Sequence, residues 1–267
     1  MSVKDNGENT SFQRLKLLIG KEALTALSKT KVIVFGLGGV GSWCAEALVR
    51  SGVGHISLVD FDVVDITNIN RQVEATSKTI GQVKTQALAA RLKEINPDCA
   101  VVPINRYFSR RDEHGNICSI EDTAGIFGIP DADYIIDAID SLESKLDLIE
   151  SARVFGRVLY SSMGMARKLD PARIKTDSIW KTRGCPLARN VREGLRRRGF
   201  TGDFTAVYSE EKPLMTNDAI HPETYHAKKI IGSAVTVTAA AGMILAGLVI
   251  NDIHKKQPLN GNPEHES

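Results

Sequence analysis

The sequence predicts an α/β fold, a doubly wound Rossmann-like and mostly parallel sheet with a smaller basic carboxyl-terminal region. A glycine-rich turn joins a short apolar strand to a helix, and acidic residues follow two further strands. The 267 residues suffice for one large or two small domains. The chain is 42% hydrophobic and 25% charged, which is typical of a soluble globular protein.

The first predicted strand, Lys31–Phe35, is rich in β-branched residues and leads directly into the glycines, with a helix predicted over Ser42–Val49. In this setting glycines allow a tight turn, a close approach of the backbone to phosphate, and packing of the helix on the strand. The glycines concerned are Gly36, Gly38, Gly39 and Gly41. The motif belongs to the fold, so nicotinamide, flavin and ATP all remain open here.

A second strand, Ile56–Val59, ends at Asp60, where a carboxylate can take both hydroxyls of a ribose. Asp62 points the same way if the chain is still extended, or else it only solvates a loop. Three polar residues come next, and a nicotinamide enzyme has no evident use for them. These residues, Asn68, Arg71 and Gln72, favour a nucleoside triphosphate.

Lys84 stands near the start of a helix predicted to run to about Ile95. A cation is poorly placed for the helix dipole at that end. A solvated lysine and a lysine directed at phosphates both fit this position, and Arg71 upstream favours the phosphates.

A later strand, Tyr134–Ile136, leads into Asp137 and Asp140. Carboxylates at the carboxyl ends of parallel strands lie where open α/β sheets bind ligands. Mg²⁺ prefers one or two carboxylates together with substrate phosphates. Asp140 is the predicted Mg²⁺ ligand, and Asp137 is interpreted as structural.

Taken together, these blocks resemble the ubiquitin-activating-enzyme-like superfamily, the ThiF/MoeB/HesA group that includes adenylyltransferases of thiamine and molybdopterin biosynthesis. The match covers roughly residues 12–165 in order and spacing. The resemblance implies a homodimer that binds ATP and Mg²⁺.

The resemblance also implies roles for individual residues. Asp60 would bind ribose, Asp62 ribose or metal, and Asp140 Mg²⁺. Asn68, Arg71 and Lys84 would hold the triphosphate, with Gln72 beside it. Arg14 resembles the family's amino-terminal arginine, which often reaches the triphosphate of the neighbouring subunit. The implied catalytic set is Arg14, Arg71, Lys84 and Asp140.

The carboxyl-terminal half separates the branches of the superfamily. Sulfur-carrier adenylyltransferases commonly carry two Cys-x-x-Cys pairs that bind zinc, and the four cysteines here form no such pair. The segments that begin at Cys185 and Tyr208 instead resemble tRNA threonylcarbamoyladenosine dehydratases. That resemblance implies a cyclising ligase that dehydrates threonylcarbamoyladenosine in tRNA through carboxylate adenylation. The alternative is activation of the carboxyl-terminal glycine of a sulfur-carrier protein, and Cys185 is interpreted as structural.

Positive charge is concentrated between Arg167 and Arg198, where eleven basic and three acidic residues lie in a chain of net charge +2. Apolar residues at helical spacing predict an amphipathic helix over 186–198, with arginines on another face. Such a run can be a solvated face, but its density favours RNA phosphates. The predicted RNA-binding residues are Arg183, Arg189, Arg192, Arg196, Arg197 and Arg198.

Residues 230–250 carry no charge and could span a bilayer, but an all-round apolar helix is equally suited to a protein core. The core interpretation is favoured, and with no amino-terminal apolar signal segment it predicts a cytoplasmic protein. Flexible tails are predicted at 1–10 and 255–267, around an adenylation domain over 11–254. Within that domain we expect an ATP-binding core over 30–165 and a basic substrate-binding region over 167–228. Three further predictions are a surface insertion over 109–132, a loop over the site that contains His221 and His226, and a possible sulfur-transfer partner.

Overall fold

The computed structural model describes residues 11–112, 114–215, 219–220 and 229–257. Its centre is a seven-stranded sheet in the order β3-β2-β1-β4-β5-β7-β6. All neighbouring strands are parallel except β6 and β7, which pair antiparallel at one edge. The predicted α/β class with a mostly parallel sheet is therefore confirmed.

The sheet strands are β1 (Lys31–Phe35), β2 (His55–Asp60), β3 (Ala100–Asn105), β4 (Tyr134–Asp137), β5 (Val158–Ser162), β6 (Ile174–Ser178) and β7 (Thr205–Ser209). A separate antiparallel pair consists of β8 (Ala219–Ile220) and β9 (Lys229–Ile230). The α-helices are α1 (Gln13–Lys29), α2 (Gly41–Arg50), α3 (Lys84–Ile95), α4 (Ile120–Phe127), α5 (Leu142–Val154), α6 (Pro186–Arg197) and α7 (Val235–Lys255). Short 3₁₀ turns are η1 (Ile66–Asn68), η2 (Ile129–Asp131), η3 (Pro171–Arg173) and η4 (Ile179–Lys181).

Alternate residues of the central strands enter two separate hydrophobic cores. Val32 and Val34 of β1 pack with α2, α3 and α7, whereas Ile33 and Phe35 pack with α4, α5 and α6. Successive side chains of a strand point to opposite faces, so a strand covered by helices on both sides is apolar throughout. This arrangement is the double winding that the sequence predicts.

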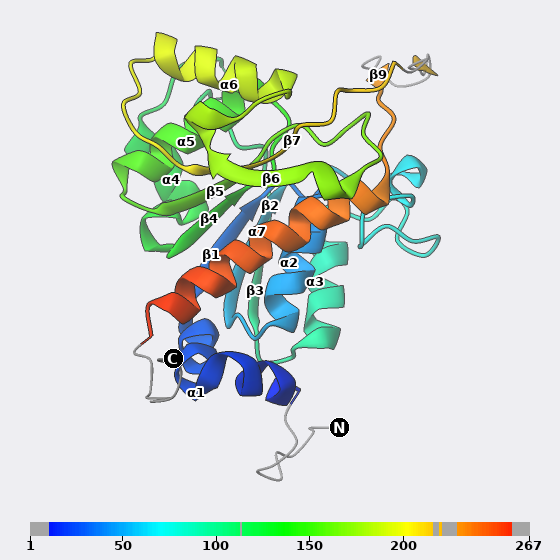
Figure 1. Ribbon diagram of the computed structural model, residues 1–267, viewed down its shortest axis with the longest axis vertical. Coiled ribbons are helices and arrows are strands. Elements are labelled where there is room, and N and C mark those ends of the chain that lie inside the picture. The colour runs from blue at the N-terminus through cyan, green and yellow to red at the C-terminus, as the bar shows by residue number, and fades with distance from the viewer. Residues whose placement is uncertain (1–10, 113, 216–218, 221–228, 258–267) are drawn as a thin grey trace, which may run out of the picture.

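The helix α7 crosses one face of the sheet beside α2, as Figure 1 shows. It is long and apolar enough to cross a membrane by length and composition. A stripe of its residues at helical spacing is nevertheless buried against the sheet and α2: Val237, Ala241, Leu245, Val249 and Ile253. At the far end, the hydroxyl of Tyr134 donates to Asp252 over 2.6 Å. This helix therefore packs as part of the core.

Two boundaries differ from the sequence-based expectation. The apolar helix begins at Val235 and continues to Lys255, so residues 231–234 precede it and part of the expected tail is helical. The segment 109–132, expected to be a surface insertion, contains α4 and η2, and Phe127 and Ile129 are buried in the second core. Ser119 caps α4 by accepting from Asp122 N–H, and Gly128 ends it with a φ of 72°. The eight residues of α4 are too few to show a clear helical period, and the segment around them contains Gly, Pro and Asp.

The strand order changes direction between β1 and β4, since β2 and β3 lie on one side and β5 on the other. Ligands of open α/β sheets bind at such a switch point, outside the carboxyl ends of the strands. The glycine-rich loop follows β1, and the segment that contains Asp140 follows β4. The fold therefore brings these two parts of the chain together at the predicted site.

Candidate functional site

The glycine-rich loop is held tightly against the segment that follows β4. Gly36 has a φ of 83°, and a Cβ atom there would lie 2.7 Å from the carbonyl oxygen of Ala138. A Cβ atom on Gly41 would overlap the carbonyl oxygen of Gly36. The expected roles of Gly36 in the turn and of Gly41 in close packing are therefore confirmed.

Gly38 differs from these two glycines because a Cβ atom there would meet no heavy atom within 4 Å. Its backbone borders open space, one turn before α2 begins at Gly41. The hydroxyl of Ser42, in the first turn of α2, donates to the carbonyl oxygen of Gly38 over 2.8 Å. Backbone N–H groups at the start of a helix favour an anion, so this loop can accept a phosphate. Gly39 packs against Arg71 and Thr238 instead.

Asp60 ends β2 beside the glycine loop. One carboxylate oxygen accepts from Leu37 N–H at 2.7 Å, and the other accepts from Asp62 N–H at 2.8 Å. These two hydrogen bonds fix the carboxylate at the carboxyl end of the strand, where a ribose is expected.

Lys84 is the first residue of α3, and its side chain is only 6% exposed. The ammonium group lies 3.2 Å from a carboxylate oxygen of Asp62, and the backbone N–H of Lys84 donates to the carbonyl oxygen of Asp62 over 3.0 Å. A buried ammonium is a strong local positive charge. The solvated-lysine interpretation is therefore wrong for Lys84, since the side chain lies inside the site.

The three polar residues between β2 and α3 are held by their own segment. Asn68 is buried and accepts from Asp65 N–H over 3.0 Å within a capping box. Arg71 donates to the carbonyl oxygen of Thr67 over 2.9 Å, and burial lowers its pKa. Gln72 is buried, and its Oε1 accepts no hydrogen bond from the described residues. The structure thus places Arg71 against the glycine loop through Gly39, and Asn68 mainly as a support of the turn.

A buried ion pair supports the loop that contains Asp140. The Lys145 ammonium lies 2.7 Å from Asp137, and both side chains are fully buried. Ser161 of the neighbouring strand donates to the same carboxylate oxygen over 2.6 Å, and the other oxygen accepts from Ile139 N–H over 3.1 Å. Asp137 therefore has the structural position expected of it. Lys145 was not predicted, because a lysine in a polar helical segment looks like any exposed one.

Asp140 lies beyond this ion pair and is exposed. No group of three or more His, Cys, Asp or Glu residues that could hold a metal occurs in the described part of the chain. A Mg²⁺ ion bound with substrate phosphates needs only one or two carboxylates. An exposed carboxylate beside the glycine loop fits that requirement.

Arg14 lies far from this site within one chain. It belongs to α1, which Figure 1 places at the opposite end of the molecule from α6. Phe12, two residues before Arg14, packs against Gly52 just beyond the carboxyl end of α2. The ten residues of α2 separate that end from the glycine loop by about 15 Å. The structure therefore does not bring Arg14 together with the other predicted residues of its own chain.

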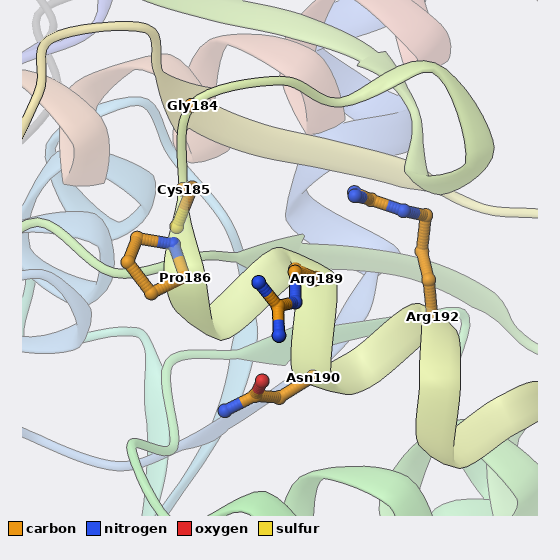
Figure 2. Close-up of a pocket in the computed structure, with 6 residues that line it drawn as sticks. All are labelled: Gly184, Cys185, Pro186, Arg189, Asn190 and Arg192. Carbon is orange, nitrogen blue, oxygen red and sulfur yellow. The ribbon is translucent and has the colours of Figure 1, made fainter.

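A cavity of about 420 Å³ opens at the start of α6. Figure 2 shows Cys185 and Pro186 at the beginning of the helix and Arg189 and Arg192 on its next two turns. The Cys185 sulfur lies 3.9 Å from the carbonyl oxygen of Gly164, just beyond the end of β5. Since β5 neighbours β4 in parallel, Gly164 leaves the sheet at the same edge as the segment that contains Asp140.

The predicted helix with basic residues is confirmed as α6, which ends at Arg197. Arg183 and Arg197 are exposed, and Arg189 is 71% exposed with Glu193 at 3.1 Å. Arg192 donates through Nη1 to Thr182 Oγ1, and the guanidinium of Arg196 lies 5.4 Å from the ring centroid of Trp180. Most of these cations therefore remain available on one surface.

Arg198 is different from its neighbours in α6. Its guanidinium forms ion pairs with Glu143, Asp147 and Glu150 of α5 at 2.7 to 2.8 Å. Arg198 therefore joins α6 to α5. This packing role was not part of the prediction, which assigned Arg198 to RNA binding.

Two buried charged groups near the site were not predicted. Glu74 is 2% exposed, and burial raises its pKa to about 7. Lys168 is also buried, donates to the carbonyl oxygen of Ser209 over 2.9 Å, and has its pKa lowered by burial. A single sequence does not show which charged residues are buried. The predicted loop that contains His221 and His226 lies outside the described residues.

Comparison with known proteins gives consistent relatives over nearly the whole chain. The sequence profile of the ThiF family matches residues 12–264. The tRNA threonylcarbamoyladenosine dehydratase of Bacillus subtilis is 39% identical, over 91% of this chain and 94% of the relative. The enzyme of the same name from Haemophilus influenzae is 34% identical, over 96% and 98%.

Solved structures agree with these relatives. The E. coli tRNA N6-threonylcarbamoyladenosine dehydratase in complex with ATP has a TM-score of 0.78 at 31% identity, covering 92% of this chain and 94% of that one. Its complex with AMP gives a TM-score of 0.80 at 30% identity, over 92% and 95%. By contrast, the E. coli molybdopterin-synthase adenylyltransferase is 39% identical over only 30% of this chain and 32% of its own length.

Proposed function

Because the chain belongs to the ThiF family, we propose that it is an ATP-dependent enzyme that dehydrates threonylcarbamoyladenosine in tRNA to its cyclic form. The observation that carries this proposal is the switch point of the sheet. An open glycine loop, a buried lysine and an exposed aspartate lie at this edge of the sheet, and the start of the basic helix α6 contacts Gly164 at the same edge. ATP chemistry and RNA binding thus adjoin on one side of the molecule.

The contacts described above support this placement of ATP. Backbone N–H groups around Gly38 would donate to the phosphates, and the carboxylate of Asp60 would accept from the ribose hydroxyls. Lys84 and Arg71 offset the negative charge that develops on the phosphates during transfer, which is the main contribution in such reactions. Asn68 and Gln72 keep the intervening segment in place.

Asp140 would hold a Mg²⁺ ion, with Asp62 as a second candidate ligand. The ion would supply charge neutralisation at the phosphates. Asp62 is already paired with Lys84, so Asp140 is the better placed of the two carboxylates.

The reaction consists of two displacements. A carboxylate oxygen of the modified nucleoside attacks the α-phosphorus of ATP, and the bond to pyrophosphate breaks. Nitrogen or oxygen of the adjacent carbamoyl group then attacks the activated carbonyl carbon, and AMP leaves with the former carboxylate oxygen. Because the nucleophile is tethered, the ring closes without a second encounter. The net change is the loss of one water at the expense of ATP, and no enzyme nucleophile is required.

The tRNA would lie on the face of α6, with the modified nucleoside in the cavity at its start. The start of α6 contacts Gly164 at the carboxyl-end edge of the sheet, the edge from which the Asp140 segment also leaves, so a nucleoside held there would present its carboxylate toward ATP. The cations that would contact RNA are Arg183, Arg189, Arg192, Arg196 and Arg197. Arg198 would act indirectly, by holding α6 on α5.

A homodimer would complete the site. Arg14 is exposed on α1 and distant from the glycine loop of its own chain, so only a second copy could bring it to the triphosphate. Two exposed leucines on the same helix, Leu17 and Leu18, give α1 an apolar surface for such an interface. The enzyme would work in the cytoplasm, with or without a sulfur-transfer partner.

The direct test is mass analysis of nucleosides from modified tRNA incubated with the protein, ATP and Mg²⁺, with mild digestion so that an activated ring survives. An ATP-dependent loss of one water from threonylcarbamoyladenosine is the expected result. No change in the nucleoside would contradict it. ATP–pyrophosphate exchange that depends on an added sulfur-carrier protein would then favour the alternative adenylyltransferase.

A further inference from the structure

Glu74 is a buried carboxyl group that the proposed reaction does not use. It is 2% exposed, and neither of its carboxyl oxygens accepts a hydrogen bond from the described residues. The neighbouring hydroxyl of Ser42 is already engaged, since it donates to the carbonyl oxygen of Gly38 and accepts from Val73 N–H at 3.3 Å. An isolated buried carboxylate is costly unless it is neutralised.

The charges around Glu74 are those of the proposed ATP site. Lys84 attracts its carboxylate and Asp60 repels it. Arg71 and Arg91 also interact with it, and Arg91 is itself paired with Glu46 at 2.5 Å. Asp62 acts on the same ammonium of Lys84. Asp62 and Glu74 thus both interact with one buried ammonium before any phosphate has entered, and Asp60 adds a negative charge nearby.

Of these three carboxyl groups, Glu74 is the one without a hydrogen-bond or ion-pair partner among the described residues. Asp60 accepts two backbone N–H groups, and Asp62 has its ion pair with Lys84. Both contacts favour the ionised form. For Glu74, burial is the largest influence and favours the neutral form, although the nearby charge of Lys84 favours the carboxylate. Burial raises the pKa of Glu74 to about 7, so small changes in nearby charge can alter its ionisation.

We propose that Glu74 takes up a proton from solvent when ATP binds and, as a neutral acid, leaves the charge of Lys84 available to the phosphates. This inference rests on the proposed function, because it needs ATP at the switch point. The proton adds to a carboxylate oxygen of Glu74, and no covalent bond of ATP changes. Glu74 is thus a positioning residue that acts through Lys84 and sets the net charge of the site.

The test is calorimetry of ATP binding without tRNA, between about pH 6 and pH 8.5, in buffers of different ionisation enthalpy. The wild type is compared with Glu74→Gln, which keeps the shape of the side chain but cannot ionise. At about pH 8 the wild type should take up close to one more proton per ATP than the variant. The ratio of wild-type to variant Kd should rise with pH, by up to about tenfold per unit. ATP itself gains or loses the same number of protons with both proteins, so its contribution cancels when the two proton uptakes are compared.

A matched control is Glu121→Gln, which changes an exposed glutamate in the first turn of α4 and should behave as the wild type. Infrared difference spectra of the wild type provide a second measurement that needs no stable variant. At about pH 8, ATP should produce the carbonyl band of a protonated carboxyl group. Equal proton uptake and pH dependence in the wild type and Glu74→Gln, or a difference spectrum without that band, would overturn this inference alone. A wild type that does not bind ATP would overturn both it and the proposed function.

Discussion

The ammonium of Lys145 and the carboxylate of Asp137 lie 2.7 Å apart, and both side chains are completely buried. The pair links α5 to the carboxyl end of β4, and Ser161 adds a hydrogen bond from β5. These contacts therefore hold the start of the segment that leads to Asp140 in place.

Replacement of Lys145 by Met leaves Asp137 buried without a countercharge. We expect the free energy of unfolding to fall by about 3–5 kcal/mol, because an uncompensated buried charge is strongly destabilising. Denaturant unfolding followed by circular dichroism measures this. The matched control, Lys175→Met, removes a half-exposed lysine that pairs with Glu210 and should cost less than about 1 kcal/mol. Equal effects of the two substitutions would contradict the role of the buried pair.

Replacement of Asp140 by Asn should reduce ATP-dependent dehydration by on the order of 100-fold while tRNA affinity stays nearly unchanged. The amide keeps the shape of the side chain but removes the charge that would hold Mg²⁺ at the phosphates. Nucleoside mass analysis and filter binding measure the two quantities separately. Asp131→Asn, an exposed aspartate in η2, serves as the control. Parallel loss of turnover and tRNA binding would argue against the assigned role.

Replacement of Arg189, Arg192 and Arg196 by Glu should weaken tRNA binding and flatten its dependence on salt. Each lost phosphate contact lowers the slope of log K against log salt by about 0.7–0.9. A control of equal charge change uses exposed lysines away from α6, namely Lys21, Lys78 and Lys93. An affinity unchanged from the wild type would remove α6 from the RNA site.

Replacement of Arg198 by Ala tests the distinction between packing and RNA contact. The side chain pairs with three carboxylates of α5, so its loss should lower the free energy of unfolding by on the order of 1 kcal/mol. The salt slope of tRNA binding should stay as in the wild type, since no phosphate contact is lost. A flattened slope in the folded variant would instead place Arg198 among the RNA contacts.

Replacement of Glu74 by Gln should change how stability depends on pH in the absence of ATP. The pKa of Glu74 is about 7 in the folded protein and 4.5 ordinarily, so the folded state binds its proton more tightly. Relative to the variant, the wild type should therefore lose stability as pH rises from about 4.5 to about 7, and then level off. The total loss is on the order of 3 kcal/mol. Parallel stability curves for the two proteins would show that Glu74 titrates normally.

Local sequence predicted the parts of the site that lie within one strand, turn or helix. The strand before Gly36, the carboxylate at Asp60, the helix that starts at Lys84 and the basic helix over Pro186–Arg197 were each predicted close to their observed bounds. Their signals are runs of apolar residues, glycine positions and helical spacing, which operate over a few residues.

Other features could not be predicted, because they depend on residues far apart in sequence. The basic region predicted over 167–228 contributes β6 and β7 to the main sheet. Arg198 pairs with α5, about fifty residues earlier in the chain.

The sequence alone was enough to predict the fold class, the glycine-rich turn and the family, because each depends on short patterns of residue type and spacing. Only the tertiary structure decided which charges are buried and what they face. Lys145 and Glu74 look like any exposed charged residue in the sequence, and the sequence left a solvated side chain open for Lys84. Burial raises the cost of an unpaired charge, so their surroundings in the fold give Lys145 a structural role and place Lys84 and Glu74 at the proposed ATP site.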